Sequence, residues 1–287
     1  MRFTDPANLD WVDGVRHRAT AINLKVLLEG HGFQLTLSEV HDTAMRSPRH
    51  RHNFDQIRIG LAGVATYGRS REIRERMIGY FPEGTRYGPQ GVTAVPNFQV
   101  VLQFEGASAS RYLATDVINR STDTLRRAGQ FRDGFYFAEG ELRGVDAFQA
   151  VWEHASGQPM VYPVPRYEDP VYLHLDSFSY HPSGDPGVDR KLLAAFSERE
   201  LSLRMTRLAP DAQVQVGDRR QRCITFVLDG PIRLGGDRLG QWSAVYTDPG
   251  EHATVSGAGQ QAELVEIALP VIEAAEVTGR QEAQVAV

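Results

Sequence analysis

The chain has 287 residues, of which 41% are hydrophobic and 23% are charged, as in soluble globular proteins with one large or two ordinary domains. A net charge of −5, with no basic stripe carrying interleaved aromatics, argues against a nucleic-acid-binding protein. No run of about 18 apolar residues could span a bilayer, and the N-terminal residues lack the apolar core of a signal peptide. The single cysteine, Cys223, excludes an intrachain disulfide framework, so we expect a cytoplasmic protein.

The N-terminal part of the chain has the pattern of short strands separated by turns. Residues 33–40 alternate apolar and polar side chains, which is typical of a half-buried strand. Further strands are predicted at 48–63, 64–67, 79–81 and 98–104. The Pro and Gly residues of 82–89 predict a tight, ordered loop. Short strands at this spacing indicate a sandwich or barrel.

The middle of the chain has a helical pattern instead. Ser121, Thr122 and Asp123 could cap a short helix that ends at Gly129, and apolar residues at helical spacing predict a second helix over 145–155. The segment 157–186 is rich in Pro, Gly and Tyr, which indicates connecting and packing segments. The strand pattern returns at 201–208, 223–230, 242–252 and 262–270. The fold class predicted from this order is all-β, with a helical segment between two β-rich halves.

The most informative stretch begins at His50. Alternate side chains of a strand share one face, and four residues here have the same parity: His50, His52, Gln56 and Arg58. Two imidazoles that converge suit a divalent metal, and an inward Arg could hold an anionic substrate. The alternatives are structural: Arg58 could pair with a residue such as Glu39, and Gln56 could bond His52 or Arg58.

Residues 48–63 and 79–90 resemble the two sequence motifs of the cupin superfamily, whose members are small jelly-roll barrels of antiparallel strands. The first motif of that family carries His-x-His, a Glu after three further residues, and a later Gly. The positions that match it here are His50, His52, Gln56 and Gly63. A neutral Gln therefore stands where the carboxylate is usual.

In the second motif Pro82 and Gly84 match, Tyr87 stands where a third His is usual, and Gln90 lies near the Asn position. Residues 223–234 resemble the corresponding strand and turn of a second cupin barrel. Its metal positions would fall at Gly217, Arg219 and Cys223, which are unsuitable as a set.

The resemblance therefore implies two jelly-roll (double-stranded β-helix) cupin barrels with a short helical linker. The predicted division is an N-terminal barrel with the candidate site over 1–110, a helical linker over 111–165, and a C-terminal barrel without a metal motif over 166–287. In such proteins the outer strands of one barrel often complete the other, so we expect a compact unit or a homodimer.

The resemblance also assigns roles in the N-terminal barrel. His50 and His52 would hold a divalent metal, and Gln56 would complete or orient it; Fe(II) is favoured, and Mn, Ni or Zn are possible. Cupin metal sites usually have three His and one Glu, so this set of ligands is incomplete. Arg58 would anchor the substrate anion, Tyr87 would donate a proton or hydrogen bond or form a wall, and Gln90 would contact substrate or hold the turn.

Three functions are compatible with these residues. The pattern from Pro48 to Arg58 is similar to the first motif of gentisate-type ring-cleaving dioxygenases, which implies a non-haem iron oxygenase acting on a small organic acid or aromatic. The second is a non-oxidative cupin isomerase, lyase or cyclase, and the third is a non-catalytic small-molecule-binding cupin. In each case the partner is a small molecule, and neither nucleic acid nor membrane is expected.

The other histidines belong to neither motif. His17 and His154 are predicted at the surface. His41 could approach the site from a neighbouring strand, and His252 is interpreted as a vestige of the second barrel's motif. His174 and His181 flank an aromatic segment, and the sequence leaves their roles open.

Overall fold

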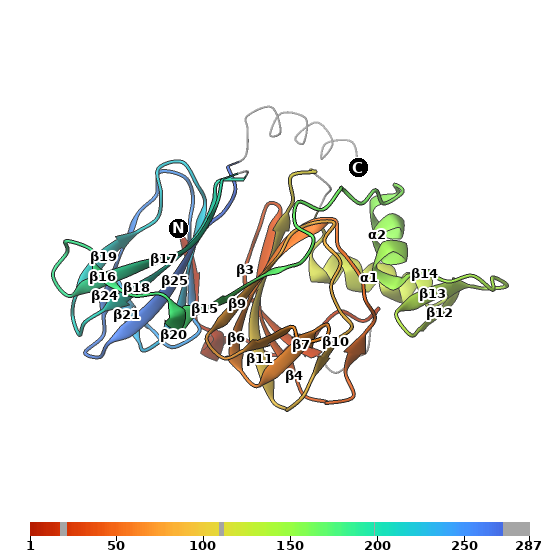
Figure 1. Ribbon diagram of the computed structural model, residues 1–287, viewed down its shortest axis with the longest axis horizontal. Helices are drawn as coiled ribbons and strands as arrows, with labels where there is room; N and C mark the ends of the chain where they lie inside the picture. The colour runs from red at the N-terminus through yellow and green to blue at the C-terminus, as the bar shows by residue number, and fades with distance from the viewer. Residues whose placement is uncertain (18–21, 109–111, 198, 272–287) are drawn as a thin grey trace. The chain divides into compact units, whose positions relative to one another are not determined.

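The structure is a computed structural model that describes residues 1–17, 22–108, 112–197 and 199–271 (Figure 1). The chain forms two compact units, here called the N-terminal unit (residues 8–177) and the C-terminal unit (residues 1–7 and 178–287). Both are built on antiparallel sheets, which confirms the predicted fold class. Among the described residues, no helix combines the length and apolar character needed to cross a membrane.

Two antiparallel sheets form the barrel of the N-terminal unit. The larger has the strand order β15-β9-β6-β11-β4-β3-β2, with bounds Val171–His174, Met77–Phe81, Phe54–Ala62, Asn97–Glu105, Phe33–Val40, Ile22–Gly30 and Val12–Asp13. The smaller has the order β5-β10-β7-β8, with bounds Arg46–Ser47, Gln90–Val92, Val64–Tyr67 and Glu72–Arg74. The predicted strands 33–40 and 64–67 coincide with β4 and β7.

Strand β4 shows how the sequence pattern relates to the barrel. Its apolar and polar residues alternate as predicted, but nearly all are buried. Leu35 and Leu37 are buried on one face, whereas Thr36 and Ser38 line an internal cavity on the other. The alternation therefore separates a packed face from a cavity face, because side chains on a strand alternate between its two sides.

A helical insertion accompanies the N-terminal barrel. Figure 1 shows α1 (Thr115–Leu125) and α2 (Ala147–Ser156) on one side of that barrel, with a three-stranded sheet of β12, β13 and β14. These three strands span Gly129–Arg132, Phe135–Ala138 and Val145–Asp146. Ile118 of α1 and Phe148 of α2 pack with Phe54 of the barrel in one buried cluster.

The two helices differ from the prediction at their N-termini. Helix α1 begins six residues before Ser121, and the Thr122 hydroxyl donates to the Ile118 carbonyl inside the helix at 2.8 Å, so neither residue is a cap. Helix α2 begins after Asp146, whose carboxylate accepts from the backbone N–H of Gln149 at 3.0 Å. It ends at Gly157, which has the left-handed conformation.

The C-terminal unit also has two sheets, around an aliphatic interior. The first has the order β1-β23-β20-β25-β18-β17-β16, with bounds Arg2–Thr4, Ala244–Thr247, Cys223–Asp229, Ala262–Ala268, Leu201–Leu208, Val188–Phe196 and His181–Pro182. The second has the order β19-β24-β21-β22, with bounds Gln213–Val216, Ala253–Gly257, Ile232–Leu234 and Asp237–Leu239. Side chains such as Val227, Val245 and Leu264 fill the space in one buried cluster. The interior of the C-terminal unit is therefore a packed hydrophobic core.

The units differ from the predicted division in three respects. The helical segment predicted as a linker is part of the N-terminal unit, because its helices bury apolar residues against the barrel. The boundary falls after residue 177 and not after 165, because β15 pairs with β9 of the N-terminal barrel. Residues 1–7 belong to the C-terminal unit, because β1 pairs with β23.

Candidate functional site

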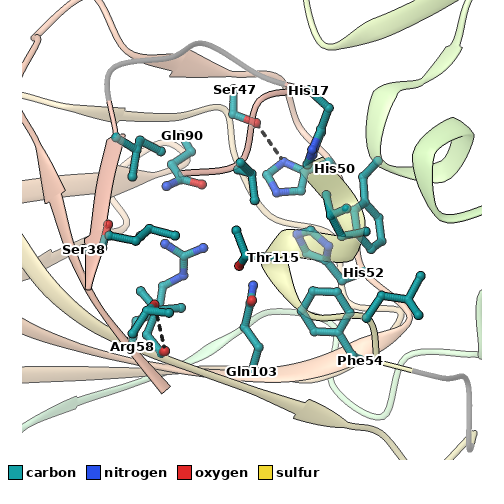
Figure 2. A pocket seen from close by; sticks show the side chains of 18 of the residues that line it. His17, Ser38, Ser47, His50, His52, Phe54, Arg58, Gln90, Gln103 and Thr115 are labelled. Atoms are coloured by element: carbon teal, nitrogen blue, oxygen red, sulfur yellow. Dashed lines mark hydrogen bonds between the residues drawn. The ribbon is translucent and has the colours of Figure 1, made fainter. Parts of the chain in front are cut away.

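A cavity of about 120 Å³ lies inside the N-terminal unit, lined by side chains from both sheets and both helices (Figure 2). Its polar lining includes His17, His50, His52, Arg58, Gln90 and Gln103. Its apolar lining includes Leu24, Met45, Phe54, Val101, Ile118 and Phe148. A 150 Å³ apolar cavity holds benzene, so this cavity has the size for a small organic molecule.

His50 and His52 reach the cavity from an irregular segment ahead of β6. Because β6 begins at Phe54, the prediction that the histidines share one straight strand with Arg58 was wrong. The second motif holds them in place instead. The backbone N–H groups of His50 and Tyr87 each donate to the other's carbonyl at 3.0 Å, and the N–H of Gly84 donates to the His52 carbonyl at 2.8 Å.

The two imidazoles are buried and close together, with ring centroids 5.0 Å apart. His50 donates its Nδ1–H to the Pro48 carbonyl at 2.7 Å, since a carbonyl oxygen can only accept; the Ser47 hydroxyl lies 3.4 Å from the same nitrogen (Figure 2). In the neutral ring this leaves the lone pair on Nε2. His50 therefore offers Nε2 as a proton acceptor or a metal ligand.

Arg58 lies on the other side of the cavity from the two imidazoles (Figure 2). Its Nε and Nη2 donate to Gln56 Oε1 at 3.3 and 3.0 Å, and its Nη1 donates to the Tyr67 hydroxyl at 3.1 Å. Among the described residues it hydrogen-bonds no carboxylate. Glu39, the expected partner, accepts instead from Asn23 at 3.2 Å.

The guanidinium of Arg58 carries its charge in this setting. Burial by itself lowers the pKa of Arg58, but Tyr67 and Tyr87 outweigh that effect, and the pKa is raised. Arg58 is half-buried, and a cation in that position whose partners among the described residues are all neutral is only partly compensated. A bound anion would supply the missing charge, which makes this wall of the cavity suited to a carboxylate.

Gln56 and Tyr87 form a layer behind Arg58. Arg58 has only donors, so the atom of Gln56 that faces it must be the oxygen. The Gln56 amide nitrogen then donates to the Tyr87 hydroxyl at 3.1 Å. Neither Gln56 nor Tyr87 is among the residues that line the cavity, whereas Gln90, on β10, lines it directly. The Gln56–Arg58 bond matches the structural alternative predicted for Gln56.

The donor set differs from a complete cupin metal centre. His50 and His52 are present, but the Gln56 oxygen is turned toward Arg58. Within the described residues no three or more His, Cys, Asp or Glu side chains are placed to hold a metal together. The charge of Arg58 on the same cavity also disfavours a second cation by Coulomb repulsion. These residues therefore do not form a full metal centre.

His17 was missed by sequence reasoning. It was predicted at the surface, but it is 4% exposed and lines the cavity. Its ring lies 5.9 Å from that of Phe148, which also contacts His52 at 4.8 Å. No motif or periodic pattern surrounds it, so the sequence held no signal for it. Gln103 was also missed, although its parity with Val101 on β11 placed it on the cavity face.

The remaining histidines do not approach this cavity. All six are exposed: His31, His41, His154, His174, His181 and His252. This agrees with the surface position predicted for His154. It also removes the suggestion that His41 reaches the site from a neighbouring strand, because β4 ends at Val40 and His41 follows it.

The positions of the second barrel that match metal positions of the motif lie in the C-terminal unit. Gly217 has no side chain to offer, and Cys223 is 8% exposed in strand β20. Burial, aided by the charges of Asp218 and Glu266, raises the pKa of Cys223 to about 12, so its thiol is protonated near neutral pH.

Comparison with known proteins supports the fold. No family model matches the sequence, and no curated protein sequence matches it. A solved structure of a candidate dioxygenase from Nostoc punctiforme is similar over 96% of this chain and 85% of its own, with a TM-score of 0.64 and 13% identity.

Two further solved structures are similar. Oxalate decarboxylase from Bacillus subtilis, studied for its Mn(II) centres, matches over 96% of this chain and 78% of its own, with a TM-score of 0.57 and 11% identity. HEPD from Streptomyces albus, with 2-hydroxyethylphosphonate and Fe(II) bound, matches over 98% of this chain and 77% of its own, with a TM-score of 0.56 and 13% identity. At these identities the similarity shows the fold alone: the chain has the two-barrel cupin fold, which metal-dependent enzymes share.

Proposed function

We propose that the N-terminal unit is an enzyme that binds a small organic acid in its cavity. The observation that carries this proposal is the pairing of a charged Arg58, whose hydrogen-bond partners in the described part of the chain are neutral, with two buried imidazoles across the same cavity. Arg58 anchors the carboxylate, because a guanidinium binds a carboxylate through charge-assisted hydrogen bonds. The apolar walls then enclose the rest of the molecule.

The chemistry that suits this arrangement is proton transfer. With its Nδ1–H held by Pro48, His50 presents Nε2 to accept a proton from a carbon near the anchored carboxylate. The proton can return to a different atom of the substrate, from His50 or from His52. Arg58 stabilises the negative charge that develops next to it. The reaction class is therefore a non-oxidative isomerisation or elimination.

A metal-dependent oxygenase is the second candidate. It is favoured by the bond from His50 Nδ1 to the Pro48 carbonyl, since metal-binding histidines commonly donate their other N–H to such an oxygen. The structural neighbours solved with Mn(II) or Fe(II) add support at the level of the fold. Here His50 and His52 would hold Fe(II), or Mn, Ni or Zn, and a bound metal would supply Lewis-acid or redox chemistry.

The first experiment measures binding of 2-oxo, 2-hydroxy and aromatic carboxylates by calorimetry. In Arg58→Gln we expect affinity for a bound acid to fall at least about tenfold, since one charge-assisted contact is removed. Arg69→Gln is the matched control, because Arg69 is exposed and does not line the cavity. Binding that is equal in the two variants would contradict the proposal.

The second experiment separates the candidate functions. Gln56→Glu restores the carboxylate of the motif next to Arg58, so it should weaken acid binding about tenfold by pairing with the guanidinium. Deuterium uptake from solvent into the bound acid, lost in His50→Gln, would support proton transfer. Stoichiometric metal in the wild type, lost in a His50→Ala/His52→Ala variant, would support the oxygenase. Binding without either would indicate the non-catalytic alternative.

A further inference from the structure

The cavity shares two lining residues with a second feature of the N-terminal unit, an outer groove of about 510 Å³. These residues are His17 and Arg46, and their position between the cavity and the groove is here called the mouth. In Figure 2, His17 lies on the same side of the cavity as His50, with Arg58 on the other.

The position of His17 is fixed by a segment tied to helix α1. The backbone N–H of Arg16 donates to Asn119 Oδ1 at 3.0 Å, and Asn119 Nδ2 donates to the Gly14 carbonyl at 3.1 Å. The Arg16 side chain adds a bond to Asp123 at 2.9 Å. His17 is then held against Phe148 of α2. These contacts place an imidazole at the mouth in a defined position.

The groove is rich in positive charge. Among the described residues, four arginines line it: Arg16, Arg46, Arg126 and Arg132. The acidic residue that lines it is Asp133. Asp123 offsets Arg16 and Arg126, and Asp133 lies 3.9 Å from Arg132. Arg46 differs from these, because Nη1 donates only to the carbonyls of Thr43 and Met45, at 2.6 and 2.7 Å. Its charge has no carboxylate partner among the described residues.

Two cationic groups thus line the cavity: Arg58, which is half-buried, and Arg46, which is exposed. Apolar side chains, including Leu24, Met45 and Val101, line the wall of the cavity. A ligand with one acidic group would satisfy Arg58 and leave Arg46 unmatched. A ligand with an acidic group at each end of a short apolar body would complement both arginines.

We propose that the organic acid bound in this cavity is a diacid, whose second acidic group binds Arg46 and His17 at the mouth. This inference rests on the proposed function and narrows its substrate class. The two acidic groups would be separated by a short apolar chain or ring, since apolar side chains such as Leu24, Met45 and Val101 line the same cavity as the two arginines. His17 and Arg46 are then the residues that select diacids over monoacids.

The test compares two series of ligands by calorimetry: straight-chain dicarboxylates, beginning at malonate, and monocarboxylates of equal length. We expect the best dicarboxylate to bind the wild type about tenfold more tightly than its monocarboxylate. Arg46→Gln should abolish that preference and leave monocarboxylate affinity unchanged. Arg58→Gln should weaken the binding of both series. Arg69→Gln, the matched charge control, should weaken the binding of neither.

His17→Phe is the second variant, because it keeps a ring against Phe148 and removes both nitrogens. It too should lower the dicarboxylate preference. The inference would be overturned if the wild type bound both series equally, or if Arg46→Gln kept the preference for dicarboxylates. In either case the proposed function survives if the affinity for monocarboxylates still falls in Arg58→Gln. Binding of neither series, or binding indifferent to Arg58, would overturn both.

Discussion

Arg166 is predicted to hold the second motif of the N-terminal barrel in place. Its Nη2 donates to both carboxylate oxygens of Asp55 at 3.0 Å and to the Tyr80 hydroxyl at 2.9 Å, and its Nη1 donates to Glu83 at 3.2 Å. Asp55 is 0% exposed and Glu83 is 2% exposed. Burial by itself lowers the pKa of Arg166, but Asp55, Tyr80 and Glu83 outweigh it and raise the pKa, so the cation is stable there.

Replacing Arg166 with Gln would leave two buried carboxylates without their cation. Breaking a buried pair in this way costs about 3–5 kcal/mol of unfolding free energy. Arg76→Gln is the matched control: Arg76 also bridges to an Asp, with Nε and Nη2 at 3.0 and 2.9 Å from Asp176, but that carboxylate is 67% exposed. An exposed pair contributes about 1 kcal/mol or less.

The assay is urea unfolding followed by tryptophan fluorescence in a Trp242→Phe background. The remaining tryptophans, Trp11 and Trp152, both lie in the N-terminal unit, so the signal reports that unit. Adding Asp55→Asn to Arg166→Gln should recover part of the loss, because it removes an uncompensated charge. A loss in Arg166→Gln no larger than in Arg76→Gln would refute the reasoning.

Three further changes test other contacts. Tyr87→Phe should destabilise the N-terminal unit by about 1–3 kcal/mol in the same urea assay, because the buried amide of Gln56 loses its acceptor. Gly84→Ala should lower the unfolding free energy by about 2 kcal/mol or more, since Gly84 has φ +76° and a Cβ would lie 2.4 Å from the Pro163 carbonyl oxygen. An unchanged urea midpoint would contradict this prediction. The unfolded Cys223 thiol loses its proton near pH 8.5 and the folded one only near pH 12, so stability should fall as pH rises through this range, by about 2 kcal/mol at pH 10. Cys223→Ala should show a smaller fall, and thiol reagents should label Cys223 only after unfolding.

The strands could be predicted well because apolar and polar side chains alternate along them. A strand in a barrel requires this period of two, since its side chains point alternately to its two faces. Strands β4, β7 and β18 fall at the predicted residues. The start of α1 was missed because Ser121 and Thr122, which resemble a cap, are buried within the helix. Cap residues in a sequence mark a helix start only when the chain before them is not itself helical.

The candidate site was only partly predictable. The spacing of His50 and His52 led to the cavity, although the segment that holds them is irregular and depends on backbone pairing with Tyr87. His17 depends on contacts between Arg16 and residues more than one hundred positions away, Asn119 and Asp123, and no local pattern encodes such contacts. The same holds for Arg166, whose role depends on two carboxylates in another part of the chain.

The replacement of the motif carboxylate by Gln56 links these features. A Glu at this position would pair with Arg58 and cancel its charge, so the cavity would be less favourable to an organic anion and more favourable to a cation. With a neutral amide, Gln56 orients the guanidinium without cancelling its charge. The charge then stays available to a carboxylate on the cavity side. One residue thus shifts the electrostatic preference of the cavity from a cation to an anion.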